Sequence, residues 1–76
     1  MTALEIADRL CDETEDQAKN ALAAMKKYVA SIPEKYTGSW YLDRNPAYRR
    51  LFVAHEEAKR AHEKACAKWR ELRDNQ

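Results

Sequence analysis

Glycine is almost absent from this chain of 76 residues, because Gly38 is the only one. Phosphate-binding loops and oxyanion-holding turns depend on glycine-rich segments, so neither kind of site is expected here. Proline occurs only at positions 33 and 46, and the helix-breaking residues are therefore confined to one region. With 36% charged residues, this composition is typical of long helices rather than of a sheet or a disordered tail.

Cysteine is also scarce, since the chain has only Cys11 and Cys66. Two cysteines are too few for the disulfide framework of a small secreted domain, so we expect reduced, packed thiols. No apolar run reaches membrane length, and the first sixteen residues carry six acids where a signal peptide would be apolar. The sequence therefore predicts a cytoplasmic protein without a membrane partner.

Neither sign of charge dominates the chain as a whole, because the formal net charge is only +1. The chain thus lacks the global basic field of a dedicated nucleic-acid binder. The charge is uneven, however: residues 1–16 hold six acids and one base, and residues 59–73 hold six bases and two acids. This asymmetry predicts that the two ends of the chain lie against each other.

A first helix is expected over residues 3–32. Thr2 and Glu5 have the spacing of a capping box, in which the hydroxyl accepts from an early backbone N–H and the carboxylate reaches back to the N–H of the cap residue. Pro33 ends the helix. Steps of three and four residues line one face, which consists of Leu4, Ala7, Cys11, Thr14, Ala18, Ala21, Met25, Tyr28 and Ile32. A kink or break near residues 12–16, which are polar on all sides, is the alternative.

A second helix is expected over residues 46–74. Asn45 is a good N-cap residue, and Pro46 suits the first helical position, where its missing N–H costs nothing. The seam of this helix alternates small with large residues and consists of Tyr48, Leu51, His55, Ala58, His62, Ala65, Trp69 and Leu72. Such a seam is coiled-coil-like, with close packing at its alanines.

The fold prediction is a single all-α domain over residues 1–76, a hairpin of two long antiparallel helices joined by an aromatic-rich linker at 33–45. Placing Ile32 opposite Pro46 gives one register for both the apolar and the charged pairs. It brings Cys11 near Cys66, Ala18 near Ala58 and Ala61, Met25 near Leu51 and Phe52, Glu5 near Arg73, and Asp8 near Arg70. A hairpin this small gains from dimerisation, so we expect a homodimeric four-helix bundle that buries Ile6, Leu10, Leu22 and Val29.

Five of the seven aromatic residues lie between positions 36 and 52. A two-helix hairpin has little interior, so we expect Trp40 and Phe52 to be mostly buried over its closed end. In the functional interpretation, some of these rings stay exposed and form the candidate partner-binding surface together with nearby arginines, because Trp, Tyr and Arg dominate interface energetics. This surface consists of Tyr36, Trp40, Tyr41, Arg44, Tyr48, Arg49 and Arg50.

The predicted register also groups Cys11, His62 and Cys66. Zinc prefers four ligands, or three and a water molecule, and His55 lies two helical turns from His62. A nucleophile and base would further need a third group to orient the histidine, and the sequence indicates none. We therefore predict no metal site, no catalytic residues, no cofactor and no small-molecule substrate.

The sequence favours a non-enzymatic protein-interaction module that binds a larger protein and bridges or blocks it. Small charged helical proteins of this class include phage-encoded inhibitors of host or defence machinery, and an inhibitor of that type is one form of this hypothesis. The alternative is a nucleic-acid-binding protein. It would use either a helix-turn-helix within residues 2–25, with a wing at 38–42, or the arginine and aromatic residues as a patch for single strands.

Overall fold

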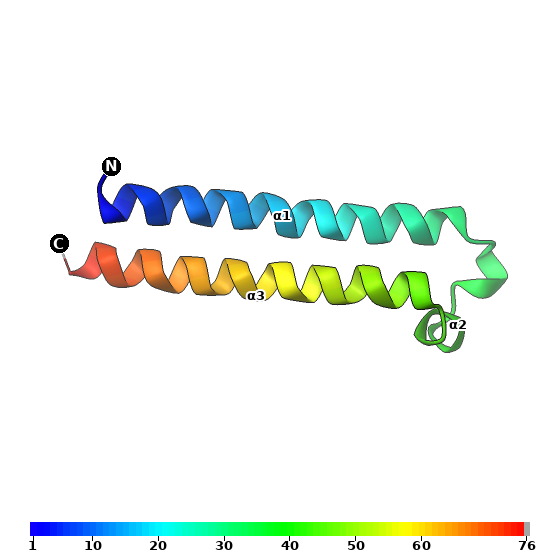
Figure 1. Cartoon of the computed structure of the whole chain (residues 1–76). Coiled ribbons are helices and arrows are strands. Elements are labelled where there is room, and N and C mark those ends of the chain that lie inside the picture. Colours follow the sequence, from blue (N-terminus) through cyan, green and yellow to red (C-terminus); the bar gives the residue numbers. More distant parts are fainter. Residues whose placement is uncertain (76) are drawn as a thin grey trace.

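Two long helices, α1 (Ala3–Ser31) and α3 (Pro46–Asp74), run antiparallel along each other in the computed structural model, which describes residues 1–75 (Figure 1). A 3-10 turn, η1 (Glu34–Tyr36), and a short helix, α2 (Ser39–Asp43), connect them. Both termini lie at one end of the hairpin, the open end, and the connection forms the closed end. The all-α prediction is confirmed.

The start of α1 is held by a reciprocal pair of side chains that differs in one detail from the expected capping box. Thr2 Oγ1 accepts a hydrogen bond from the Glu5 backbone N–H at 3.1 Å, as predicted. The Glu5 carboxylate does not return to the backbone of Thr2 but accepts from its hydroxyl at 3.2 Å. The helix ends at Ser31, because Pro33 holds Ile32 in extended geometry with φ −89° and ψ 140°.

The alternative of a break near residues 12–16 is wrong, because α1 is continuous through this segment. Thr14 is buried on the face toward α3, and its hydroxyl donates to the carbonyl oxygen of Leu10 at 2.7 Å. A threonine whose hydroxyl donates to a backbone carbonyl oxygen of the preceding turn remains compatible with a helix. The polar appearance of the segment therefore reflects its solvent-exposed sides and not an interruption.

The seam between the helices consists of the residues that the periodicity selected. Every residue predicted for either seam is buried or half-buried. The most enclosed positions hold small residues, since Ala65 is only 3% exposed and Ala7 only 5% exposed. Among the described residues, no large side chain is completely buried. The hairpin is thus held by close approach of two helices rather than by a thick core.

The predicted contact between Cys11 and Cys66 is confirmed, but the predicted ion pairs are not. Cys11 Sγ lies 3.9 Å from Cys66 Sγ, and Thr14 Oγ1 lies 3.1 Å from His62 Nδ1. Each ion pair within residues 1–75 joins two residues of the same helix, so Glu5 does not pair with Arg73, nor Asp8 with Arg70. Exposed charges at the edges of a seam gain little from pairing and stay hydrated.

The apolar stripe outside the seam remains uncovered. Ile6 is 53% exposed, Leu10 and Leu22 are also exposed, and Val29 is half-buried. The molecule measures 54 × 17 × 14 Å and has a radius of gyration of 16.5 Å, whereas a compact chain of this length has about 11 Å. No helix in residues 1–75 combines the length and the apolar character needed to cross a membrane.

The close seam makes a testable prediction at Ala65. The Ala65→Leu variant should lower the free energy of unfolding by about 2 kcal/mol, because the added side chain forces the helices apart. Urea unfolding measures this change. The matched control is Ala67→Leu, at an exposed position on the same helix, which should stay within about 0.5 kcal/mol of the parent. Equal losses in the two variants would contradict close packing at Ala65.

Candidate protein-binding surface at the closed end

The closed end gathers η1, α2 and the first turns of α3 into one region opposite the termini (Figure 1). Asn45 fixes how α3 begins there. Its Oδ1 accepts hydrogen bonds from the backbone N–H groups of Ala47 at 3.0 Å and Tyr48 at 3.1 Å. The same oxygen also accepts from the Tyr28 hydroxyl of α1 at 3.1 Å. One side chain therefore caps α3 and ties it to α1.

An aromatic cluster, defined here as Tyr36, Trp40, Tyr41 and Arg44, covers η1 and α2. The Tyr41 ring meets Tyr36 edge-on with centroids 5.1 Å apart and meets Trp40 edge-on at 4.8 Å. The Arg44 guanidinium lies 4.2 Å from the Trp40 ring centroid and donates to the Trp40 carbonyl oxygen at 2.9 Å. Edge-to-face rings and a stacked guanidinium hold one another in place.

The expectation that Trp40 is mostly buried is wrong, because its side chain is 60% exposed. Tyr36 and Tyr41 are exposed as well. The physical reason is the shortness of α2, which has five residues and packs on α3 near the connection. A helix of that length cannot carry its outward-facing tryptophan back over the seam. The cluster is therefore ordered by internal contacts while its outer surface faces solvent.

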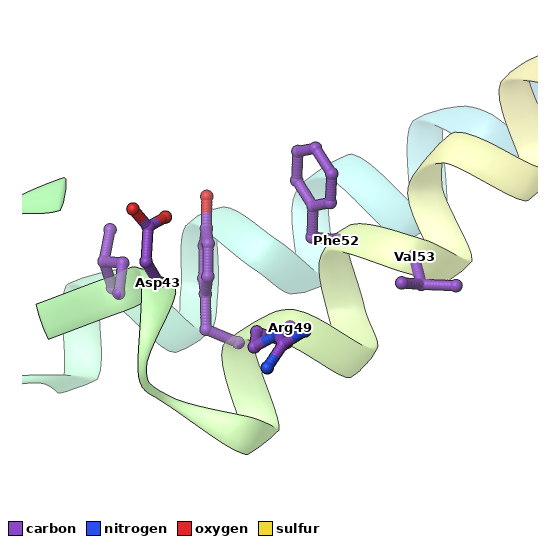
Figure 2. Close-up of a pocket in the computed structure, with 6 residues that line it drawn as sticks. Asp43, Arg49, Phe52 and Val53 are labelled. Atoms are coloured by element: carbon purple, nitrogen blue, oxygen red, sulfur yellow. The ribbon is translucent and has the colours of Figure 1, made fainter. Parts of the chain in front are cut away.

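A groove of about 380 Å³ lies beside the cluster, between the end of α2 and the first turns of α3. It is lined by Leu42, Asp43, Tyr48, Arg49, Phe52 and Val53. Figure 2 shows the Phe52 ring and the Asp43 carboxylate extending to the same side of the chain. Apolar carbon forms most of the groove, and one acidic and one basic group stand at its edge.

Phe52 was also expected to be mostly buried, and this is wrong because it is 46% exposed. Leu51 is the seam residue of that turn, and the next residue is rotated by about 100° around the helix. That rotation turns Phe52 away from α1 and onto the wall of the groove. Its ring lies 6.4 Å from that of Tyr48, at an interplanar angle of 34°.

The closed end is positively charged even though the chain as a whole is nearly neutral. Residues 26–53 contain six basic and two acidic side chains. Within the described chain, none of the ion pairs involves Arg44, Arg49 or Arg50. Because Arg44 is engaged by Trp40, Arg49 and Arg50 are the cations that the first turns of α3 offer to a partner.

The structure divides the seven predicted site residues into two neighbouring groups. Tyr36, Trp40, Tyr41 and Arg44 form the aromatic cluster, while Tyr48 and Arg49 line the groove. Arg50 faces a second hollow that also includes Arg49 and Val53. Sequence reasoning missed Leu42 and Val53 and assigned Phe52 to the core. The available signal was that Phe52 and Val53 follow Leu51 directly, giving more apolar side chains than one seam can bury.

A second polar cluster lies nearer the open end, where Cys11, Thr14, His62 and Cys66 meet. His62 Nε2 is 3.4 Å from Cys66 Sγ, and His62 Nδ1 faces the Thr14 hydroxyl. The sequence analysis found no group to orient this histidine, and the structure corrects that point with Thr14. In residues 1–75, no group of three or more His, Cys, Asp or Glu side chains is arranged to hold a metal ion.

The geometry expected for a helix-turn-helix is not present. That arrangement needs a turn within residues 2–25, and α1 is a single helix there. The proposed wing at 38–42 is helical, because it overlaps α2.

Comparison with protein-family models, with curated proteins and with solved structures gives no match to this chain.

The three hydrogen bonds to Asn45 Oδ1 predict the stability of the closed end. Asn45→Ala should lower the free energy of unfolding by about 2 kcal/mol, because it removes a helix cap and leaves Tyr28 without its acceptor. Asn45→Asp is the matched control, since it keeps an acceptor oxygen at the helix N-terminus and should lose far less. Thermal unfolding followed by circular dichroism compares the two. If Asn45→Ala were as stable as Asn45→Asp, the cap would not hold the closed end.

Proposed function

We propose that this chain is a non-enzymatic protein-interaction module whose closed end docks on an acidic surface of a larger protein. The observation that supports this most is the exposure of Trp40 on an ordered aromatic cluster. Exposed Trp and Tyr rings that are already fixed by neighbours lose little conformational entropy on binding. They are also the side chains that contribute most to protein interfaces.

The groove beside the cluster gives the proposed interface a concave element. Its apolar walls, Leu42, Phe52 and Val53, suit an aliphatic or aromatic side chain of the partner. Arg49 at its edge suits a carboxylate next to that side chain, because a guanidinium forms bidentate contacts with carboxylates. Protein interfaces usually have an apolar centre, here a side chain of the partner in the groove, and a polar rim that surrounds it.

Charge supports an acidic partner surface. The excess of basic side chains at the closed end would speed encounter with a negatively charged protein and disfavour a positively charged one. By occupying such a surface, a rod of this size would either block it or bridge it to another copy. An inhibitor of the phage-encoded type, acting in the cytoplasm, fits this mode of action.

Binding of single-stranded nucleic acid is the second candidate, because aromatic rings and arginines also bind bases and phosphates. The Trp40 ring, however, already has Arg44 stacked on it, and Tyr41 is packed against both neighbouring rings. Bases stack on free aromatic faces, and this cluster offers fewer of them than its ring count suggests. We therefore favour a protein partner.

Replacing the two arginines at the start of α3 by glutamates tests whether positive charge at the closed end promotes binding. Arg49→Glu with Arg50→Glu should lower partner recovery at least about tenfold in an affinity pull-down, because each side chain at a charged interface contributes about 1 kcal/mol or more. The matched control is Arg60→Glu with Lys64→Glu, which makes the same change in net charge on the same helix but away from the groove. This control should bind like the parent.

The aromatic cluster is tested in the same assay with Trp40→Ala and Tyr41→Ala combined. This variant should fold, as its seam is intact, and should lose the partner. Equal recovery of the partner by the parent, the aromatic variant and both charge variants would contradict the proposal. Retention that falls steeply with salt and is competed by an oligonucleotide would instead favour the nucleic-acid candidate.

We also propose that two hairpins pair into a four-helix bundle. The accessible surface is 5891 Å², whereas a compact monomer of this mass exposes about 4800 Å². The uncovered stripe of Ile6, Leu10 and Leu22 accounts for apolar surface that a second copy would bury. A homodimer would thus supply the core that the seam alone lacks.

Sedimentation velocity tests the dimer. The parent chain should sediment as a dimer at high micromolar concentration, and Leu10→Glu with Leu22→Glu should convert it to a monomer, because buried unpaired carboxylates oppose association. Ala23→Glu, at an exposed position of α1, is the single-site control and should remain dimeric. A monomeric parent would contradict the bundle.

A further inference from the structure

The cluster of Cys11, Thr14, His62 and Cys66 is not used by the proposed interface, and its hydrogen bonds have a definite direction. The Thr14 hydroxyl has one proton and donates it to the Leu10 carbonyl oxygen at 2.7 Å. Toward His62 Nδ1, 3.1 Å away, the same hydroxyl can then act only as an acceptor. With the hydroxyl proton directed at the Leu10 carbonyl oxygen, we assign the imidazole proton of His62 to Nδ1.

This assignment leaves His62 Nε2 as the unprotonated ring nitrogen. Cys66 Sγ lies 3.4 Å from Nε2 and 3.8 Å from Nδ1, so the sulfur packs against the imidazole ring, nearer to Nε2. Cys11 Sγ lies 3.9 Å from Cys66 Sγ on the other side and is placed to donate to it. The Cys11 thiol and the His62 imidazole thus both contact the Cys66 sulfur, and His62 is the base beside it.

The two cysteines differ in their polar neighbours, because His62 contacts Cys66 whereas Asp8 and Asp12 act on Cys11. Burial raises the pKa of the Cys11 thiol above its ordinary value, and the neighbouring Cys66 sulfur and the carboxylates of Asp8 and Asp12 act in the same direction. These surroundings disfavour the thiolate form of Cys11. Since the thiolate is the nucleophile, Cys66 is the attacking sulfur and Cys11 the resolving one. Both sulfurs are half-buried, so a molecule as small as a peroxide can reach them.

We propose that Cys11 and Cys66 are a redox-active pair that hydrogen peroxide converts into an intramolecular disulfide between α1 and α3, with His62 as the base for Cys66. The pair lies in the half of the hairpin near the termini, away from the aromatic cluster. Neither sulfur belongs to the proposed protein-binding surface.

The chemistry balances with peroxide as the oxidant. Cys66 Sγ gives its proton to His62 Nε2 and attacks one peroxide oxygen, so that an S–O bond forms and the O–O bond breaks. The departing hydroxide takes the proton from the imidazolium and leaves as water. Cys11 Sγ then attacks the sulfenic sulfur of Cys66, forming the S–S bond and breaking the S–O bond, and its proton leaves with the second hydroxide as water. Two thiols are oxidised, and one peroxide is reduced to two water molecules.

The disulfide would change the stability of the hairpin, because it closes a loop between residues 55 apart. Such a crosslink removes chain entropy from the unfolded state, and Tm should rise by about 10 °C or more. The helices must move slightly closer, since the sulfurs have to approach from 3.9 Å to bonding distance at about 2 Å. Small neighbours at the seam leave room for this movement.

The experiment treats the full chain, fully reduced beforehand, with hydrogen peroxide at low micromolar protein concentration. Intact mass spectrometry should show a monomer that has lost two hydrogen atoms and no longer reacts with a maleimide, and a phosphine reductant should restore both thiols. Cys11→Ser and Cys66→Ser should each prevent this loss. Maleimide-reactive thiols after oxidation, a crosslink mainly between two chains, or an unchanged Tm would each overturn the proposal.

The role of His62 is tested by rate and pH. His62→Gln should slow oxidation at pH 7 by at least about tenfold and should approach the parent rate above about pH 9, where thiols ionise without a base. His55→Gln, on the same seam two turns away, is the matched control and should oxidise like the parent. Circular dichroism establishes that both variants fold. A His62→Gln variant that oxidises at the parent rate at pH 7 would remove the histidine from the mechanism.

Discussion

The close approach of α1 and α3 through small residues is the constraint on which the rest of this molecule depends. Ala7 and Ala65 occupy the most enclosed positions of the seam, together with Thr14 and Met25. A seam built in this way gains contact through the proximity of two backbones and buries little large apolar surface. The bulky side chains that would form the core of a larger domain are therefore left to other parts of the surface.

The closed end shows this consequence most clearly. Trp40 and Phe52 cannot enter a space that is already filled by the approach of the helices, so they line an exposed cluster and a groove. Order there comes from local contacts, namely the three hydrogen bonds to Asn45 and the stacking of Arg44 on Trp40. A rigid exposed surface at one end of a rod is the feature that supports a binding function.

The same close approach also creates the polar cluster near the open end. Because the backbones are near each other, short side chains from opposite helices can touch, and Cys11 reaches Cys66 while Thr14 reaches His62. Longer residues at these positions would have kept the helices apart. Packing and the chemistry proposed for the thiols thus have one geometric cause, and they occupy the end of the hairpin away from the aromatic cluster.

The sequence by itself determined the two long helices and the seam between them, because three-four periodicity, the Thr2 and Asn45 caps and the two prolines act over short distances along the chain. It did not indicate η1 or α2, which lie in the segment expected to be a linker. It also indicated Tyr36, Trp40 and Tyr41 as surface candidates. Only the tertiary structure decided that Trp40 and Phe52 face solvent and that Thr14 orients His62. Exposure and hydrogen-bond direction depend on how closely the helices approach and on the length of α2, which no local pattern in the sequence specifies.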